Sequence, residues 1–191
     1  DGNLRLIWVG SIDGRKNLEL LLEALSTLDE RDRSLRLDVI GDGPLKDAMQ
    51  ARARELALED LVRWHGQLSR QETLQRFQSA HCHIITSLGE GNPTTLWEAM
   101  ASGTPTISLD HCGMHDVICE NCGIKIPLGA KKAMIGDLAN AIRKLDNDRN
   151  LLRKLSAGCF KCAERFSWEN RHQFFNRCYG NAIDHYNRMH S

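Results

Sequence analysis

The stretch SLGEGNPTTLWEAMASGTP, from Ser87 to Pro105, decides the fold of this chain. It begins at the end of the apolar run 82–86, passes through a glycine-containing loop, and continues into a helical pattern that stops at Gly103. A further strand-like run then begins at Thr104. Strand, glycine loop, helix and strand in this order are typical of a parallel sheet, because a helix must carry the chain back before the next parallel strand begins. The stretch therefore predicts a βαβ unit.

The same alternation runs through the rest of the sequence. Strands are expected at residues 4–9, 35–40, 61–65, 82–86, 104–109 and 123–126. Helices are expected at residues 18–28, 45–56, 72–78, 93–101, 133–145, 149–166 and 168–189, with a short helix ending at 117–118. We therefore predict an α/β fold with a Rossmann-like, doubly wound parallel sheet over residues 1–167, followed by a C-terminal helix over 168–191. Ligands of such sheets bind at the carboxyl ends of the strands.

Composition excludes some functions. The 191 residues are 41% hydrophobic, which is enough for one sizeable core. Lys and Arg number 25, as do Asp and Glu, so no global positive charge attracts nucleic acid or an anionic membrane. No apolar run approaches the roughly 20 residues that cross a bilayer. Because the sequence opens at Asp1 without Met and without a signal peptide, we expect a fragment of a cytoplasmic protein.

The seven cysteines are odd in number, which favours a reducing compartment over a disulfide framework. Two C-x-x-C pairs, Cys119/Cys122 and Cys159/Cys162, could together supply four thiolates to zinc. The pairs are far apart in sequence, however, and the second lies in a helical pattern. Packing is therefore the preferred interpretation, and a zinc-bearing structural or interaction domain is an alternative.

The loop before the helix at 93–101 has the chemistry of an anion site. Gly91 lets backbone approach a ligand closely, and Pro93 suits the first turn of a helix, whose free N–H groups favour phosphate. Glu90 and Glu98 flank this helix start. Carboxylates repel phosphate but accept hydrogen bonds from sugar hydroxyls, so the loop predicts a ligand that carries both groups.

The spacing Glu90-x7-Glu98, continued by EAMASGTP to Pro105, resembles the signature of retaining glycosyltransferases of family 4, which have the GT-B fold. Four further landmarks agree in order and spacing: Val9-Gly10 with Lys16-Asn17, Ile40-Gly41-Asp42-Gly43-Pro44, Trp64-His65-Gly66, and Phe166-Ser167-Trp168-Glu169. The resemblance extends over essentially the whole chain. It is confined to the C-terminal, donor-binding half of the family's fold.

The resemblance implies a nucleotide diphosphate-sugar donor and transfer with retention at the anomeric carbon. Glu90 would contact the donor sugar beside the reacting carbon, Lys16 would neutralise the diphosphate, and these two form the expected catalytic pair. Glu98 would hold the ribose hydroxyls. The full expected donor-binding set is Gly10, Ser11, Arg15, Lys16, His65, Gly66, Glu90, Gly91, Asn92, Pro93, Thr94, Thr95, Glu98, Gly113 and Met114.

The sequence departs from the family at three positions. One is Asp116, an acidic residue that is commonly Glu in the family. Ser11 stands where the family usually has Arg, and Arg15 is a candidate to supply the lost charge. Cys112-Gly113 stands where the family usually has a glycine pair. His111 and His115, which lie beside this pair, are further candidates for a ligand contact.

No Asp-x-Asp pair suited to a metal is visible, so we expect no metal and no other cofactor at the donor site. The acceptor would be a saccharide or a lipid bound through a missing N-terminal domain, toward which the helix at 168–191 would pack. Peripheral association of the intact protein with the inner face of the membrane is left open. We expect little transferase activity from the chain alone. The alternatives are a non-catalytic nucleotide-sugar-binding module and a related GT-B epimerase.

Overall fold

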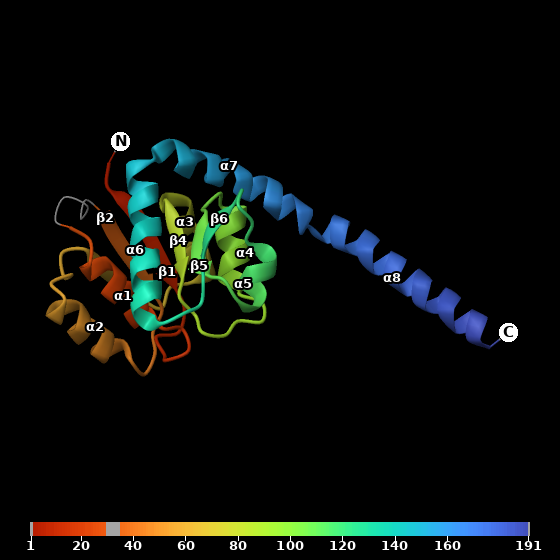
Figure 1. Cartoon of the computed structure of the whole chain (residues 1–191), viewed down its shortest axis with the longest axis horizontal. Coiled ribbons are helices and arrows are strands. Elements are labelled where there is room, and N and C mark those ends of the chain that lie inside the picture. The colour runs from red at the N-terminus through yellow and green to blue at the C-terminus, as the bar shows by residue number, and fades with distance from the viewer. Residues whose placement is uncertain (1, 30–34, 191) are drawn as a thin grey trace.

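Six parallel strands form one sheet in the computed structural model, which describes residues 2–29 and 35–190. The strands are β1 (Leu4–Val9), β2 (Leu35–Ile40), β3 (Val62–Gly66), β4 (Cys82–Ile85), β5 (Thr106–Leu109) and β6 (Gly123–Ile126). Their order across the sheet is β3-β2-β1-β4-β5-β6 (Figure 1). The chain thus winds outward in both directions from the neighbours β1 and β4, which confirms the predicted doubly wound α/β sheet. A ligand crevice is expected at the carboxyl ends of these two strands.

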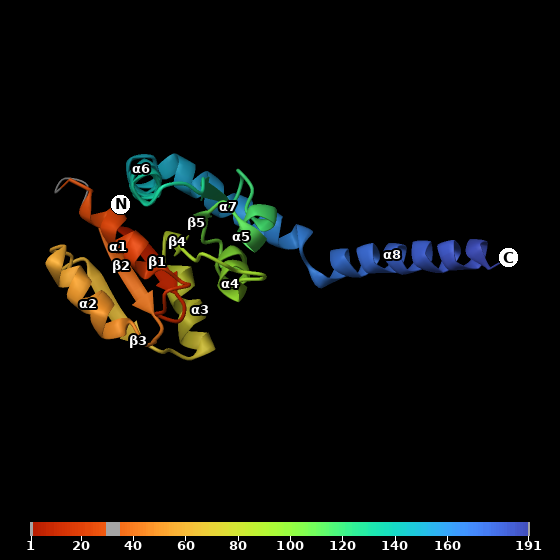
Figure 2. The same ribbon diagram turned by 60° about the horizontal axis from the view of Figure 1, so that its bottom comes forward.

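Helices cover both faces of the sheet (Figure 2). One face carries α1 (Leu18–Ser26), α2 (Lys46–Glu55) and α6 (Lys131–Asn147), and the other carries α3 (Arg70–Ser79) and α4 (Thr94–Ala101). The short α5 (Cys112–Val117) follows β5, and α7 (Arg149–Arg165) packs against both α6 and α4. The predicted helices are all present, with ends that differ by two residues or fewer.

The central strand β1 is buried on both sides. Leu6 and Trp8 belong to the large apolar cluster with α1 and α6, while Ile7 packs with Phe77 and Ala99 on the opposite face. Successive side chains of a strand point to opposite faces, so burial of both faces explains why this strand is almost continuously apolar. Each such side chain contributes roughly 1.5–3 kcal/mol on burial.

The fifth strand begins later than predicted. We expected it from Thr104, but β5 starts at Thr106. Pro105 has no amide hydrogen to donate, and the Thr104 hydroxyl donates to the carbonyl oxygen of Phe77 at 2.8 Å. The Pro105 carbonyl oxygen still accepts from the His83 amide of β4 at 2.9 Å, so Thr104 and Pro105 lead directly into the strand.

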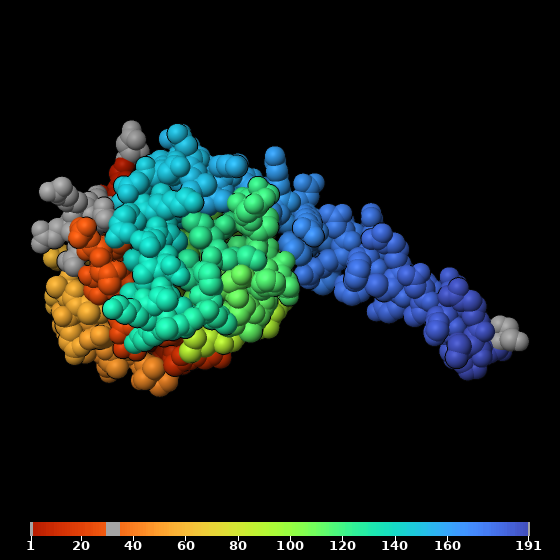
Figure 3. All heavy atoms as spheres, in the orientation of Figure 1, coloured from red at the N-terminus to blue at the C-terminus, as the bar shows by residue number. Residues whose placement is uncertain are grey.

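The last helix, α8 (Trp168–Met189), projects away from the rest of the molecule (Figure 3). None of its described residues is buried, and Trp168 is 77% exposed. At its start, Trp97 of α4 lies edge-on to Phe166 and beneath the guanidinium of Arg171. In the part of the chain that the structure describes, no helix combines the length and apolarity that a membrane span requires.

Candidate functional site

Two loops meet in the crevice between β1 and β4. The first follows β1 and carries Arg15 and Lys16, and the second follows β4 and carries Glu90. The Lys16 ammonium donates to Glu90 Oε1, and Arg15 Nη1 donates to the same oxygen at 3.0 Å. Arg15 Nη1 also lies 3.0 Å from the carbonyl oxygen of Gly89. Two cationic side chains therefore converge on one carboxylate at the place where doubly wound sheets bind ligands.

Lys16 is held in place by a chain of hydrogen bonds from the core. The indole of buried Trp8 donates to the Thr86 hydroxyl at 3.2 Å, and this hydroxyl donates to the carbonyl oxygen of Lys16 at 2.9 Å. The Lys16 amide donates to Asp13 Oδ1 at 2.9 Å, and the Leu88 amide donates to the Arg15 carbonyl oxygen at 2.8 Å. The two loops are thus tied to each other and to the sheet before any ligand is present.

Glycine at position 10 leaves room for the Lys16 side chain. A Cβ at this position would lie 3.3 Å from both Cδ and Cε of Lys16. The aliphatic part of Lys16 therefore runs directly over Gly10. Ser11, the next residue, is exposed and contributes no charge where the family usually carries Arg.

Glu90 remains ionised in this setting. Partial burial raises the pKa of its carboxyl group, but hydrogen bonds from Lys16 and Ser87 and the charges of Lys16 and Arg15 outweigh burial and hold the pKa below its ordinary value. A charged Glu90 in turn keeps Arg15 and Lys16 together until a ligand anion replaces it.

The start of α4 lies on the same edge of the sheet. Pro93 is the N-cap residue, and no side chain caps this helix start. The neighbouring Asn92 does not serve as a cap, because its Oδ1 accepts a hydrogen bond from Trp97 Nε1 at 2.6 Å. Thr94 is exposed and Thr95 half-buried at the first turn. Amides at such a helix start suit an anion.

Glu98 lies further along α4, with a side chain that is 20% exposed. Its Oε1 accepts from Arg70 Nε at 3.2 Å, and the Arg70 side chain is 81% exposed. The pair is therefore easily opened. Arg70 can turn into solvent and leave the carboxylate free for a ligand hydroxyl.

Two predicted turn glycines, Gly10 and Gly41, line a hollow of about 290 Å³. The Gly41 amide donates to the Gly66 carbonyl oxygen at 2.8 Å, and a Cβ on Gly41 would lie 1.8 Å from the Gly10 carbonyl oxygen. The lining residues are Val9, Gly10, Ser11, Ile40, Gly41, Asp42, Gln67, Leu68 and Thr73. The size and place of this hollow suit a flat ring. A larger cavity of about 620 Å³, lined in part by Arg5 and His81, lies at the opposite edge of the sheet, away from the predicted site.

The imidazole of His65 is engaged elsewhere. Its Nε2 lies 2.7 Å from Asp38 Oδ1 on the neighbouring strand. Gly66, with a φ of 67°, then turns the chain toward Gln67 and Leu68, which line the hollow. At this edge the backbone after His65, and not its ring, is available to a ligand.

The loop before α5 closes the site from the side of β5. The Gly113 amide donates to the Glu90 carbonyl oxygen at 3.0 Å, and a Cβ on Gly113 would lie 2.4 Å from the Gly91 carbonyl oxygen. Cys112 has a φ of 49°, which is the left-handed region that glycine favours, so the position that departs from the family keeps the family's backbone shape. Met114 is fully buried, so in this structure it offers no surface to a ligand.

Of the two histidines expected near this loop, His111 is tied to the site and His115 is not. His111 Nε2 lies 2.8 Å from the Ser87 carbonyl oxygen, whereas His115 Nδ1 lies 2.8 Å from Asp110 Oδ1 on the exposed side. Both histidines lie close to Gly113 in the sequence, so the sequence could not show which of them contacts the site.

Sequence reasoning missed the residues that support the site. Thr86 and Asp13 position Lys16, Ser87 supports Glu90, and Arg70 pairs with Glu98. Two small polar residues directly after strand β4 were the available signal for Thr86 and Ser87. Arg70 gave no signal, because only the packing of α3 beside α4 brings it to Glu98.

The arrangement defines the class of protein. A six-stranded parallel sheet of order β3-β2-β1-β4-β5-β6, flanked by helices, is one half of a GT-B glycosyltransferase fold. Over residues 1–159 the sequence matches the family described as Glycosyl transferases group 1. The chain belongs to this family.

Relatives and solved structures agree with this assignment. A D-inositol 3-phosphate glycosyltransferase of Streptomyces bingchenggensis is 27% identical over 97% of this chain and 42% of its own length. The lipopolysaccharide outer core galactosyltransferase WaaB, solved in its apo form, superimposes with a TM-score of 0.77 at 28% identity, covering 95% of this chain and 50% of that chain. The pneumococcal O-GlcNAc transferase GtfA, solved with UDP and GlcNAc, shares the fold with a TM-score of 0.80 at 21% identity, covering 95% of this chain and 37% of that chain. The chain thus spans half of these proteins or less.

Proposed function

We propose that this chain binds the nucleotide diphosphate-sugar donor of a retaining glycosyltransferase, and that the intact protein transfers the sugar to a saccharide or lipid acceptor. The observation that carries the proposal is the convergence of Arg15 and Lys16 on Glu90 in the β1–β4 crevice. Family membership and the UDP bound by the fold relative GtfA support the same donor class.

The diphosphate would take over the cations that Glu90 now holds. Phosphate oxygens carry more charge than one carboxylate and form strong charge-assisted hydrogen bonds with Lys and Arg. The uncapped start of α4 adds amides on the same edge. Glu90, released from Lys16, is then free to accept hydrogen bonds from donor sugar hydroxyls. Glu98 accepts from the ribose hydroxyls once Arg70 moves away, and the base occupies the hollow beside Gly10 and Gly41.

In the transfer step, the bond between the anomeric carbon and the diphosphate oxygen breaks, and the acceptor oxygen bonds to that carbon. The acceptor proton passes to the departing nucleoside diphosphate. Charge grows on the leaving phosphate as the bond breaks, so Lys16 and the α4 amides stabilise the transition state more than the ground state. These fixed donors supply the positive charge for the step, and we propose that transfer requires no metal ion at this site.

The acceptor site belongs to the rest of the intact protein. The chain spans 42% of the Streptomyces relative, and α8 presents exposed apolar side chains, among them Phe174, Tyr179 and Ile183. We propose that these side chains pack against the N-terminal half, that the complete enzyme acts in the cytoplasm or at the inner face of the membrane, and that this chain alone transfers little or no sugar.

Isothermal titration calorimetry of the purified chain tests donor binding. UDP, GDP and ADP, each with its sugar derivatives, are titrated into the chain and into a Lys16→Ala variant. We expect saturable binding of one nucleoside diphosphate series and a tenfold or greater loss in the variant. Absence of binding by a folded sample to every nucleotide would refute the proposal.

A second experiment separates an enzyme from a non-catalytic binding module, which Ser11 makes the closest alternative. Glu90→Gln in the full-length protein should abolish sugar transfer while nucleoside diphosphate binding persists. A full-length protein that binds the donor but has no turnover before the substitution would favour the binding module. An epimerized sugar nucleotide as the product would favour the related epimerase.

A further inference from the structure

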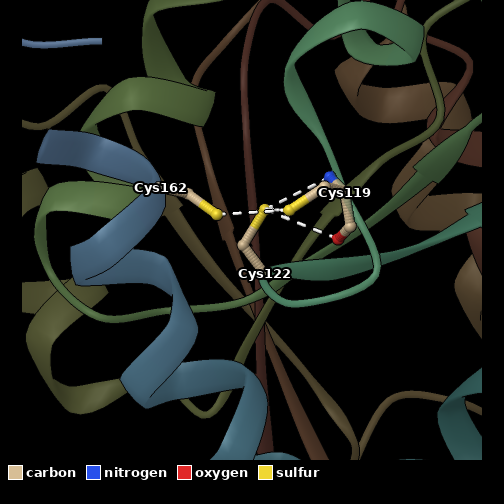
Figure 4. Close-up of side chains that lie close together, drawn as sticks. All are labelled: Cys119, Cys122 and Cys162. Carbon is tan, nitrogen blue, oxygen red and sulfur yellow. Dashed lines mark hydrogen bonds between the residues drawn. The ribbon is translucent and has the colours of Figure 1, made fainter. Parts of the chain in front are cut away.

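Three cysteines come together on the far side of α5 from the donor site. Cys119 Sγ lies 3.7 Å from Cys122 Sγ and 3.2 Å from Cys162 Sγ, and the three sulfur atoms all lie within 4.8 Å of one another (Figure 4). Cys119 and Cys122 lie in the loop between α5 and β6, whereas Cys162 points toward them from α7. The contact joins positions 43 residues apart, so it is a product of the tertiary structure.

The loop has the tight geometry that sequence spacing alone could not reveal. The amides of Cys122 and Gly123 both donate to the Cys119 carbonyl oxygen, at 3.0 and 3.2 Å. The Cys119 amide donates to Cys122 Sγ at 3.4 Å. Backbone donors aimed at sulfur stabilise the thiolate form, which is the form that binds a metal.

Helix α7 approaches this loop more closely than a side chain would allow. A Cβ on Gly158 would lie 1.7 Å from the carbonyl oxygen of Asn121. Glycine at this position therefore permits the contact that brings Cys162, one turn further along α7, to the loop. This close packing, which does not involve the sulfur atoms, fixes the position of α7 relative to the cysteine loop.

The surroundings suit an entering cation. Cys119 and Cys162 are half-buried and Cys122 is buried, so the cluster is open on one side and apolar on the other, where Ile118 and Met114 pack.

We propose that Cys119, Cys122 and Cys162 bind one Zn²⁺ as thiolates, with a water molecule in the fourth position. Zn–S bonds of about 2.3 Å place tetrahedral sulfurs about 3.75 Å apart. The Cys119–Cys122 pair already fits this spacing, and the Cys119–Cys162 pair needs to open by about 0.5 Å. Binding releases the three thiol protons to solvent. The ion would fasten α7 to the segment that follows α5, and so support the loop at Gly113.

Cys159 is excluded from this set, which corrects the four-thiolate arrangement that the two C-x-x-C pairs suggested. Its Sγ faces the Cys122 carbonyl oxygen at 3.5 Å, and it lies outside the group of three sulfur atoms that are all within 4.8 Å of one another. It lies in the apolar cluster with Leu96 and Met100 as a neutral packing residue. The site is independent of the proposed donor chemistry, because no residue is shared.

Elemental analysis of the untagged chain, purified without chelator, tests the proposal. We expect about one zinc per chain, and seven titratable thiols after denaturation with EDTA. Cys119→Ser and Cys162→Ser should reduce the zinc content to background, with circular dichroism confirming that each variant is folded. The matched control is Cys178→Ser, which replaces an exposed thiol on α8 and should leave the zinc content unchanged.

Three results would overturn the assignment. A zinc-free chain with two thiols fewer than the seven would indicate a disulfide between Cys119 and Cys162 instead. A zinc-free chain with all seven thiols, whose affinity for added Zn²⁺ equals that of Cys162→Ser, would show that the cluster is packing alone. Loss of zinc in Cys159→Ser would show that the three-thiolate set is wrong. Failure of nucleotide binding would affect none of these readouts.

Discussion

The Lys16 ammonium is hydrogen-bonded to the Glu90 carboxylate across the β1–β4 crevice, although 74 positions separate the two residues in the sequence. Neither loop forms an anion site by itself. The β1 loop contributes the cation, and the β4 loop contributes the carboxylate that pairs with it. Under the proposed function, a diphosphate would have to displace Glu90 from Lys16.

Replacing Lys16 by Ala should weaken binding of a nucleoside diphosphate by roughly 10- to 100-fold, the equivalent of one charge-assisted hydrogen bond of about 1.5–3 kcal/mol. Arg15→Ala should cost less, because the Arg15 side chain is 52% exposed and interacts more weakly. Calorimetry of both variants shows whether Lys16→Ala loses more affinity for the nucleoside diphosphate than Arg15→Ala does. Equal losses in the two variants would contradict the central role given to Lys16.

Gly10→Ala should weaken diphosphate binding several-fold without unfolding the chain. The new methyl group would lie 3.3 Å from two carbons of Lys16 and displace its side chain from the crevice. The matched control is Gly14→Ala in the same loop, where an added Cβ meets no atom within 4 Å. Binding and melting temperature are measured together, and an unaffected Gly10→Ala would show that Lys16 has other room to reach the ligand.

Glu98→Gln should reduce discrimination between ribose and 2′-deoxyribose nucleotides. The carboxylate is a strong acceptor for the ribose hydroxyls, and its amide accepts more weakly, so about 1–2 kcal/mol of preference should be lost. Arg70→Ala removes only the exposed partner of Glu98 and should leave the preference intact. Competition titrations with matched ribose and 2′-deoxyribose nucleotides measure the ratio of their dissociation constants. An unchanged ratio in Glu98→Gln would show that Glu98 does not contact the ribose.

The free energy of unfolding should fall as pH drops below about 6.5. His83 is fully buried on β4, and burial lowers its pKa to about 3. Below pH 6.5 the unfolded chain binds a proton on this histidine that the folded chain does not bind, so acid favours unfolding. The loss from His83 should be about 1.5–2 kcal/mol between pH 6.5 and pH 5.

Urea unfolding curves across this pH range give the slope of the free energy of unfolding against pH. The His83→Leu variant is measured in the same way for comparison. His81 contributes in the same direction, since burial lowers its pKa to about 4, and it remains in both proteins. The variant should therefore retain a shallower slope than the parent chain. Parallel slopes would mean that His83 is accessible to protons in the folded state.

Truncation after Ser167 should change the free energy of unfolding by no more than about 1 kcal/mol. Helix α8 buries no described residue, and its contact with the domain is confined to its first turns, where Arg171 covers Trp97. An exposed cation–π contact contributes about 0.5–1 kcal/mol. Chemical denaturation of both chains measures the difference. A loss of several kcal/mol would mean that α8 packs on this domain in solution.

The sequence alone determined the fold class and the order of the elements. The strands Leu4–Val9, Leu35–Ile40 and Gly123–Ile126 lie where they were predicted. For β1 the physical reason is that a parallel strand buried on both faces needs an almost continuous apolar run. Glycine loops followed by helices predicted which edge carries the site. The ends of the elements were predicted less accurately than their order. Strand β5 begins after Pro105, two residues later than predicted, and β3 ends one residue later.

Only the tertiary structure decided which side chains meet. Lys16 and Glu90 pair because β1 and β4 are neighbours, Arg70 reaches Glu98 because α3 packs beside α4, and Cys162 joins Cys119 because Gly158 lets α7 approach the loop. The spacing of apolar residues along the sequence indicates whether a segment is a helix or a strand. Contacts between distant segments depend on how these elements pack against one another. The physical reason is that a hydrogen bond or a metal site requires its groups within a few ångströms, and sequence separation does not measure that distance.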